Sequence, residues 1–344
     1  MAANHLQTAD NLFHVPTPLL HSTSLSRQVG CNIWLKCENL QPSGSVKIRG
    51  MGLAVLRAVN NAMPAQLVTA STGNAAVALA YVSRQLNRPA NVFVPQNTPA
   101  HIVTSAKNEG ATVTVDGSDL EEAVHLAQTY AQQHPGCHFI HPFDDADVQQ
   151  GYATLISEIK LQLGHQPPEG ILLGVGGGGL LAGVLQGLDA HQWNQVPAIA
   201  VETHGSNAFQ SSRVSGQVQT LDACKTLASG LRSKRVTLAA INQSTSHPVI
   251  PFSVSDPMAA NACQLFAACG AVLSLIYSGV IRDVIPNLEP SSNIVVILAG
   301  GLDITVEQLN EFRCKYSNPP IIVKSGSEIY MRLASDADAS KSGK

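Results

Sequence analysis

The sequence predicts an α/β fold in which a mostly parallel β-sheet is flanked by helices. Short apolar segments of strand length alternate along the chain with longer segments of helical character. Two strand-to-helix junctions carry unusual turns, one rich in Ser, Thr and Asn and the other made of glycines. Hydrophobic residues make up 44% of the chain and charged residues 13%, a balance that suits a globular enzyme.

The expected strands and helices alternate between residues 66 and 299. Each expected strand is a short apolar run, and each expected helix is a longer segment that is Ala-rich or apolar at helical spacing. Strands are expected at 66–70, 90–94, 111–115, 170–174, 198–202 and 293–299, and helices at 75–86, 101–108, 120–134, 180–188, 258–266 and 271–282.

Composition limits the possible functions. The length of 344 residues allows one large or two ordinary domains. A net charge of −3 without a long basic block gives little support to nucleic-acid binding. Seven scattered cysteines without a C-x-x-C pair argue against a disulfide framework or a zinc site. Neither a secretory signal at residues 1–5 nor an uninterrupted apolar span is visible, so we expect a cytoplasmic protein without a membrane partner.

Lys47 lies in the segment Gln41–Gly50, QPSGSVKIRG, shortly after the apolar stretch Asn32–Lys36. Small neighbouring residues let a flat cofactor approach the backbone. A partly desolvated lysine amine can act as a nucleophile and form a Schiff base. An ordinary lysine near a turn is the alternative, and two further segments favour the chemical role.

The second segment is Ser71, Thr72, Gly73 and Asn74, which follows an expected strand and opens an expected helix. Hydroxyls, an amide and free backbone N–H groups at a helix start can bind a carboxylate or an oxyanion. Ser, Thr and Asn are also preferred at ordinary helix N-caps. Taken alone, this segment is better interpreted as a cap.

The third segment is the run Gly176, Gly177, Gly178 and Gly179, between an expected strand and an expected helix. Successive glycines let the backbone fold into a set of N–H donors at a helix start, which is a phosphate-binding geometry. Because each glycine loses much conformational entropy on folding, a purely structural role is not expected.

The same run also satisfies a dinucleotide-binding pattern. Gly174, Gly176 and Gly179 match G-x-G-x-x-G, and Glu202 ends the next expected strand, about 20 residues further on. A nicotinamide enzyme is therefore a competing hypothesis. However, the pattern lies in mid-chain and leaves Lys47 and the Ser/Thr/Asn turn unexplained.

A cofactor with one aldehyde and one phosphate explains all three segments. Pyridoxal 5′-phosphate needs an amine for its aldehyde, backbone donors for its phosphate and a separate site for the carboxylate of its substrate. Its ring then accepts the electrons of a carbanion at Cα.

Together these segments closely resemble the serine/threonine dehydratase family of the fold type II, tryptophan synthase β-like pyridoxal-phosphate enzymes. The resemblance extends from His14–Pro18, HVPTP, to Ile294–Gly301, IVVILAGG. It implies two open twisted sheets with the cofactor between two domains. A large domain would combine 1–50 with 143–334, a small domain would span 51–142, and 335–344 would be a disordered tail.

The resemblance also implies roles for the site residues. Lys47 would hold the cofactor and remove the Cα proton of an L-serine- or L-threonine-like substrate, which then loses its β-hydroxyl and yields a keto acid and ammonia. Gly176 to Gly179 would bind the phosphate, Asn74 the 3′-oxygen, and Ser71 to Asn74 the substrate carboxylate. Val46 would lie near the cofactor, and Ala299 would face the ring nitrogen.

Two further features are implied by the resemblance alone. Val201–Gly205 and Leu231–Ser233 are similar to stretches that bind a cation in this family, with Glu202 as a possible ligand of K⁺ or Mg²⁺. A surface carboxylate at the end of a strand is the alternative for Glu202. A homodimer is the expected assembly.

This chain departs from the family at residues that would line the pocket. Val46 replaces a frequent Phe, Ala299 replaces Ser, Thr or Cys, and Leu302 and Asp303 replace Ser and Asn of the liver-type relatives. Phe266–Gly270, FAACG, lacks a Glu-Pro pair. Three alternatives therefore stay open: β-replacement, racemisation with Thr72 returning a proton, and a catalytically impaired cofactor-binding protein.

Overall fold

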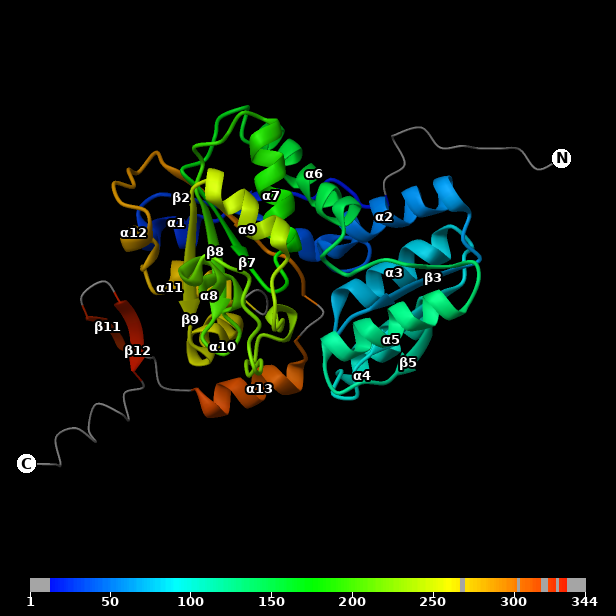
Figure 1. Cartoon of the computed structure of the whole chain (residues 1–344). Helices are drawn as coiled ribbons and strands as arrows, with labels where there is room; N and C mark the ends of the chain where they lie inside the picture. The colour runs from blue at the N-terminus through cyan, green and yellow to red at the C-terminus, as the bar shows by residue number, and fades with distance from the viewer. Residues whose placement is uncertain (1–12, 267–269, 302–303, 317–320, 326–327, 333–344) are drawn as a thin grey trace, which may run out of the picture.

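The computed structural model describes residues 13–266, 270–301, 304–316, 321–325 and 328–332. The chain folds around two β-sheets that lie in separate halves of the molecule (Figure 1). Leu302, Asp303, Ala267–Cys269 and the expected tail at 335–344 lie outside the described residues.

The larger sheet is mixed, with β1 antiparallel to β2 and the other neighbours parallel. Successive side chains point to opposite faces of this sheet, and each face packs against a core of its own. In β10, Val295 and Ile297 belong to one core, and Ile294 and Val296 belong to the other. In spatial order its strands are β1 (Leu19–His21), β2 (Asn32–Lys36), β10 (Asn293–Ile297), β7 (Gly170–Gly174), β8 (Ala198–Thr203) and β9 (Val249–Val254).

The smaller sheet is entirely parallel. Its strands, in spatial order, are β5 (Thr112–Val115), β4 (Ala90–Val94), β3 (Gln66–Ala70) and β6 (Cys137–Phe139). A separate antiparallel hairpin is formed by β11 (Ile321–Ser325) and β12 (Glu328–Arg332).

Helices cover both sheets and join them. They are α1 (Thr23–Val29), α2 (Lys47–Ala62), α3 (Asn74–Gln85), α4 (Ala100–Asn108), α5 (Leu120–Gln133), α6 (Ala146–Gln162), α7 (Gly179–Ala190), α8 (Ala208–Ser215), α9 (Leu238–Ser246), α10 (Asp256–Phe266), α11 (Gly270–Tyr277), α12 (Ile281–Val284) and α13 (Val306–Lys315), with short 3₁₀ helices at Glu38–Leu40 and Ser229–Leu231. None of the helices in the described part of the chain is long and apolar enough to cross a membrane.

Local sequence explains several helix starts. The side chains of Asp119, Asp145 and Thr237 accept hydrogen bonds from the first amides of α5, α6 and α9. Thr305 and Gln308 form a reciprocal capping box at α13.

The α/β fold with two open sheets flanked by helices is confirmed, but one expected helix is wrong. The segment 271–282 is not continuous: α11 ends at Tyr277, and α12 begins at Ile281. Gly279 lies between them with φ +74°, a left-handed backbone conformation that stops a helix. The strand expected to reach residue 299 ends at Ile297.

The expected domain boundaries remain a prediction. The smaller sheet uses strands from 66–139 and the larger sheet uses strands before and after them, which is compatible with one domain inserted into the other. However, the boundary expected between residues 50 and 51 falls inside α2. One continuous hydrophobic core includes residues from both sheets and from α2 and α6.

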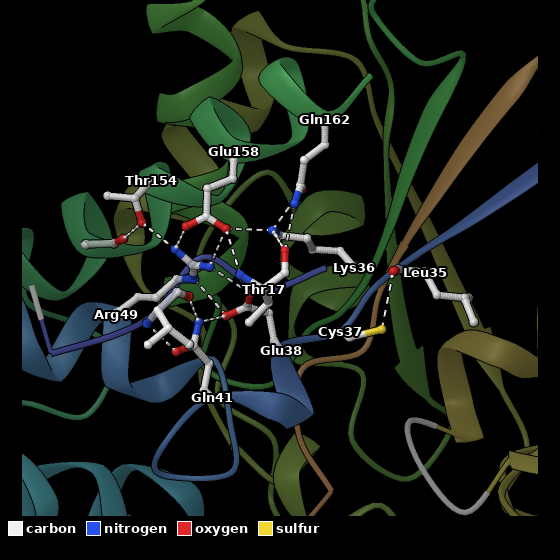
Figure 2. Close-up of polar contacts among 12 residues, drawn as sticks. Thr17, Leu35, Lys36, Cys37, Glu38, Gln41, Arg49, Thr154, Glu158 and Gln162 are labelled. Carbon is white, nitrogen blue, oxygen red and sulfur yellow. Dashed lines mark hydrogen bonds and ion pairs between the residues drawn. The ribbon is translucent and has the colours of Figure 1, made fainter. Parts of the chain in front are cut away.

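A buried ion network links α2, α6 and the end of β2 (Figure 2). Arg49, in the first turn of α2, donates to Glu38 with an Nε–Oε2 distance of 2.7 Å and to Glu158 with an Nη1–Oε1 distance of 2.7 Å. Lys36 reaches Glu158 with an Nζ–Oε2 distance of 2.6 Å. Three of these side chains are fully buried, and that of Glu158 is 15% exposed.

The network favours the charged forms of Glu158 and Arg49. Burial alone would raise the pKa of Glu158, but its bonds with Arg49 and Lys36 bring that pKa below its usual range. Burial would likewise lower the pKa of Arg49, but its bonds with Glu38 and Glu158 raise it. Two basic and two acidic side chains therefore meet inside the protein. Removing one member leaves an uncompensated buried charge.

Replacing Arg49 by Met should destabilise the protein strongly. The change removes a buried cation and leaves Glu38 and Glu158 without its charge, so the free energy of unfolding should fall by about 3–5 kcal/mol. Urea titration of the purified variant measures this loss.

Arg84→Met is the matched control, because Arg84 pairs with Glu109 while its side chain is 48% exposed. That substitution should change the free energy of unfolding by less than about 1 kcal/mol. Equal losses in the two variants would contradict the structural importance of the network.

His14 gives the protein a pH dependence in the acidic range. Burial and the positive charge of Arg49 lower the pKa of His14 to about 4. The unfolded chain therefore takes up a proton on this ring at a higher pH than the folded chain does. The contribution of neutral His14 to the free energy of unfolding is therefore complete above the pKa of the unfolded chain. It is lost as the pH falls toward 4. In His14→Gln, urea unfolding between pH 7 and pH 4 should show a shallower loss of stability, whereas an unchanged pH profile would exclude this role.

Candidate active site

A cavity lies between the two halves of the molecule, at the carboxyl ends of β7 and β10. This is the edge at which parallel α/β sheets bind their ligands. Its described walls come from the starts of α2, α3 and α7, from the segment 227–231, and from α10, α11 and the end of β10. They include Val46, Lys47, Asn74, Phe143, Gly174–Leu181, Leu227–Leu231, Ala259, Cys263, Val272, Ala299, Gly300, Ile304 and Phe312.

Lys47 is the first residue of α2, and the end of β10 holds the turn before it. The amide of Val46 donates to the carbonyl of Ala299 over 2.8 Å, and Ser45 forms a β-bridge with Gly300. Val46 is buried, and the Lys47 ammonium lies 5.7 Å from the ring centroid of Tyr152 in α6. The lysine is therefore placed by fixed backbone rather than by a mobile loop.

The Ser/Thr/Asn turn reaches the cavity through Asn74, the first residue of α3. Ser71 is buried, and its hydroxyl accepts from the amide of Gly73 over 3.1 Å. Ser71, Thr72 and Gly73 precede Asn74 but do not form part of the cavity wall. The structure thus places Lys47 and Asn74 on the same cavity wall. The other residues of the expected carboxylate turn lie outside that wall.

The glycine run forms the opposite wall. Gly178 caps α7 with φ +84°, which explains glycine at that position. In the described part of the chain, the amides of Gly176, Gly177 and Gly178 donate to no protein acceptor. They lie at the start of α7, where the first amides of a helix favour an anion.

Packing also requires these glycines. A Cβ on Gly177 would lie 2.4 Å from the ring of Phe143, and a Cβ on Gly179 would lie 2.5 Å from the carbonyl oxygen of Phe143. The absence of side chains is therefore explained in part by this close contact. The glycine run alone is a weaker sign of phosphate binding than its sequence suggested, and the uncommitted amides are the stronger one.

The remaining walls are mostly apolar. Ala299 and Gly300 lie at the end of β10, and the polar side chains described on the walls are Lys47, Asn74, Ser229 and Cys263. Burial raises the pKa of the Cys263 thiol to about 11, so the thiol is neutral near pH 7. Lys47 is thus the ionisable amine of an otherwise weakly polar described cavity.

Glu202 lies outside the cavity wall and is not a surface carboxylate. Its side chain is buried, and its two oxygens accept from the amides of Phe209 and Gln210, each over 2.8 Å. Burial raises the pKa of Glu202 to about 7, although these two bonds oppose the shift. A carboxylate held at the start of α8 in this way is poorly placed to bind a ribose, which weakens the dinucleotide hypothesis.

Comparison with known proteins decides between the remaining cofactor hypotheses. Residues 11–300 match the family described as "Pyridoxal-phosphate dependent enzyme". The chain belongs to this family. The resemblance inferred from the motifs is confirmed. The family match does not support the alternative of a nicotinamide-binding enzyme.

Individual relatives in this family are similar to the chain in sequence and in structure. The human protein named "L-serine dehydratase/L-threonine deaminase" is 40% identical over 312 residues, which cover 87% of this chain and 94% of the human protein. A fungal L-serine ammonia-lyase from Rhizomucor miehei superimposes with a TM-score of 0.84 and 41% identity, covering 88% of this chain and 99% of the fungal one. Maize serine racemase, at 24% identity, shares the fold with a TM-score of 0.79 and covers 89% of this chain and 93% of its own.

The described residues of this pyridoxal-phosphate family member fit the cofactor. The Lys47 amine matches the aldehyde, the free amides of the glycine run match the phosphate, and the apolar walls match the ring. In addition, the buried hydroxyls of Ser43 and Ser45 have no hydrogen-bond partner among the described residues, so both can still form hydrogen bonds beside the lysine turn.

Sequence reasoning missed several residues near the site. Phe143 packs on the glycine run, Leu227–Leu231 forms one wall, and the Tyr152 ring lies beside Lys47. None of them belongs to a motif with its own chemical signature. A buried glycine run needs a partner surface, but the identity of that partner depends on tertiary contacts.

Proposed function

We propose that this protein catalyses the pyridoxal-phosphate-dependent elimination of water from L-serine or L-threonine, giving a 2-keto acid and ammonia. The observation that carries the proposal is the convergence of the Lys47 amine, Asn74 and the uncommitted amides of the glycine run on one cavity. The overall identity of 40% to a human protein named for this reaction supports it.

Each residue has a defined task in this reaction. Bound pyridoxal phosphate would supply an aldehyde carbon and an electron-accepting ring. The Lys47 amine would hold the cofactor at that carbon and would take the proton from the substrate Cα. The β-hydroxyl then leaves with a proton as water, and hydrolysis of the enamine product gives the keto acid and ammonia.

Binding is assigned to the helix starts. The amides of Gly176 to Gly178, at the start of α7, would hold the phosphate, with Gly179 keeping Phe143 close. Asn74, with Ser71, Thr72 and Gly73 at the start of α3, would bind the substrate carboxylate and the ring oxygen. Val46 would pack beside the cofactor. Ala299 offers the ring nitrogen no hydrogen bond.

The alternative reactions receive less support. Racemisation needs a second proton-transfer group, for which Thr72 is the candidate, and the relatives at about 40% identity are named for elimination. A catalytically impaired protein is the alternative suggested by Ala299, because a ring nitrogen without a partner stabilises a carbanion less well. Product analysis with L-serine and L-threonine distinguishes keto acid, D-amino acid and unchanged substrate.

We also propose that K⁺ or Mg²⁺ binds near Glu202. Ser206 directly follows the expected stretch Val201–Gly205 and donates to the carbonyl oxygen of Leu231 over 2.9 Å, so the two expected cation-binding stretches lie near each other. Binding would favour the ionised Glu202 carboxylate and stabilise the fold.

A cation bound at this position should stabilise the wild type but not Glu202→Gln. At 100 times its Kd, the cation should add about 2.7 kcal/mol to the free energy of unfolding. Urea titrations in KCl, in MgCl₂ and in tetramethylammonium chloride at equal ionic strength measure the effect. Identical stability in all three salts would exclude the site.

A cytoplasmic homodimer is the assembly we propose. The described cysteines are free thiols, as a reducing compartment requires. Leu20 lies on the edge strand β1 and is half exposed, and Val15 and Leu40, which precede and follow β1 in sequence, are also exposed, so apolar side chains are available to a second copy. Sedimentation equilibrium measures the assembly directly, and a monomer at all concentrations would exclude it.

Replacing Lys47 by Ala should abolish the reaction. Loss of the general base should lower kcat by at least about 10²-fold, and the visible absorbance of the lysine-bound cofactor should disappear. Keto-acid release and the absorbance spectrum, with L-serine and with L-threonine, measure both effects. Lys107→Ala, an exposed lysine of α4, is the matched control and should behave like the wild type. A Lys47→Ala variant that keeps its activity would refute the proposal.

A further inference from the structure

We propose that Tyr152 is a positioning residue for Lys47, and that its ring face holds the lysine amine in its charged form after that amine has taken the substrate proton. This inference rests on the proposed function of Lys47. It concerns a residue of α6 that is not part of the glycine, lysine or Ser/Thr/Asn segments.

The contact has the geometry of a cation–π interaction. The Lys47 nitrogen lies 5.7 Å from the centroid of the Tyr152 ring. An ammonium within about 6 Å of an aromatic ring is attracted by the negative face of that ring, and the attraction is stronger when water is excluded. Tyr152 is fully buried, so water does not compete for its face.

Neighbouring glycines fix the ring in this place. A Cβ on Gly50 would lie 2.9 Å from the Cζ atom of Tyr152, and a Cβ on Gly183 would lie 2.5 Å from its Cβ atom. The ring thus packs against Gly50 of α2, and the Cβ atom from which it projects packs against Gly183 of α7, at positions that leave no room for a side chain. Lys47 and Gly50 are three residues apart on α2 and share the helix face that the ring covers.

The ring, rather than the hydroxyl, is the part that can act on Lys47. The Tyr152 hydroxyl is buried and forms no hydrogen bond in the described part of the chain. Burial raises its pKa well above the usual range, so it stays neutral and offers no negative charge. A phenylalanine would therefore preserve the interaction.

Apart from Lys160 near the far end of α6, the other charged side chains of α2, α6 and α7 form ion pairs. On α2 and α6, Arg49 pairs with Glu158, and Arg57 pairs with Asp147. On α7, Asp189 pairs with His247, and β10 has no ionisable side chain. The ring of Tyr152 therefore favours a charged amine without itself carrying a charge.

The test compares Tyr152→Leu, which removes the ring face, with Tyr152→Phe, which keeps it. In the cofactor-free protein, labelling of Lys47 by an amine-selective reagent is followed by mass spectrometry as a function of pH. Loss of the ring should move the labelling curve of Tyr152→Leu by about 0.5 to 1.5 pH units to lower pH. The curve of Tyr152→Phe should coincide with that of the wild type.

Kinetics provide the second measurement. If the ring holds the protonated amine, Tyr152→Leu should lower kcat about 5- to 30-fold and increase the isotope effect with α-deuterated L-serine, while Tyr152→Phe retains both values. Should the leucine variant not fold, Tyr152→Met fills a similar volume without a ring face and gives the same comparison.

Two results would overturn the inference. An unchanged labelling curve in Tyr152→Leu or Tyr152→Met would show that the ring does not act on the amine. An equal change in Tyr152→Phe would assign the effect to the hydroxyl instead. Both results are independent of the proposed function, whose failure would appear as a wild type that forms no coloured complex with pyridoxal phosphate.

Discussion

The buried pairing of Arg49 with Glu38 and Glu158 is the constraint on which the site depends. Arg49 stands two residues after Lys47 in the first turn of α2, so fixing its guanidinium fixes the start of that helix. Its partners lie after β2 and on α6, which ties the larger sheet to the helix that carries the lysine. A buried charge network tolerates few alternative arrangements, because each unpaired member is costly.

Around this fixed lysine, the site relies on backbone more than on side chains. The described walls are mostly apolar or glycine, and the uncommitted amides at the start of α7 supply donors without a charged residue. Few mobile polar groups need to reorganise during the reaction in such a site. The same fold in a serine racemase shows that the architecture alone does not determine the reaction. The side chains next to the cofactor must do so.

The sequence predicted the parts of the fold that follow from local pattern. The alternation of apolar strands and helices predicted the mostly parallel sheets, and the lysine, Asn74 and glycine segments did converge on one cavity. The ion network could not be predicted from the sequence. Arg and Glu are common at exposed helix positions, and Arg49 and Glu158 are buried only by tertiary packing. Phe143 and Tyr152 were missed for the same reason. Their roles depend on glycines that are distant in sequence.

The central claim is that Lys47, held by this network, is the amine that bonds pyridoxal phosphate. Borohydride reduction of the protein with its cofactor, followed by proteolysis and peptide mass spectrometry, tests it most directly, because reduction makes the bond permanent. The account predicts that the cofactor is found on the peptide that contains Lys47 and on no other peptide. Cofactor attached to a different lysine, or to none, would contradict the account.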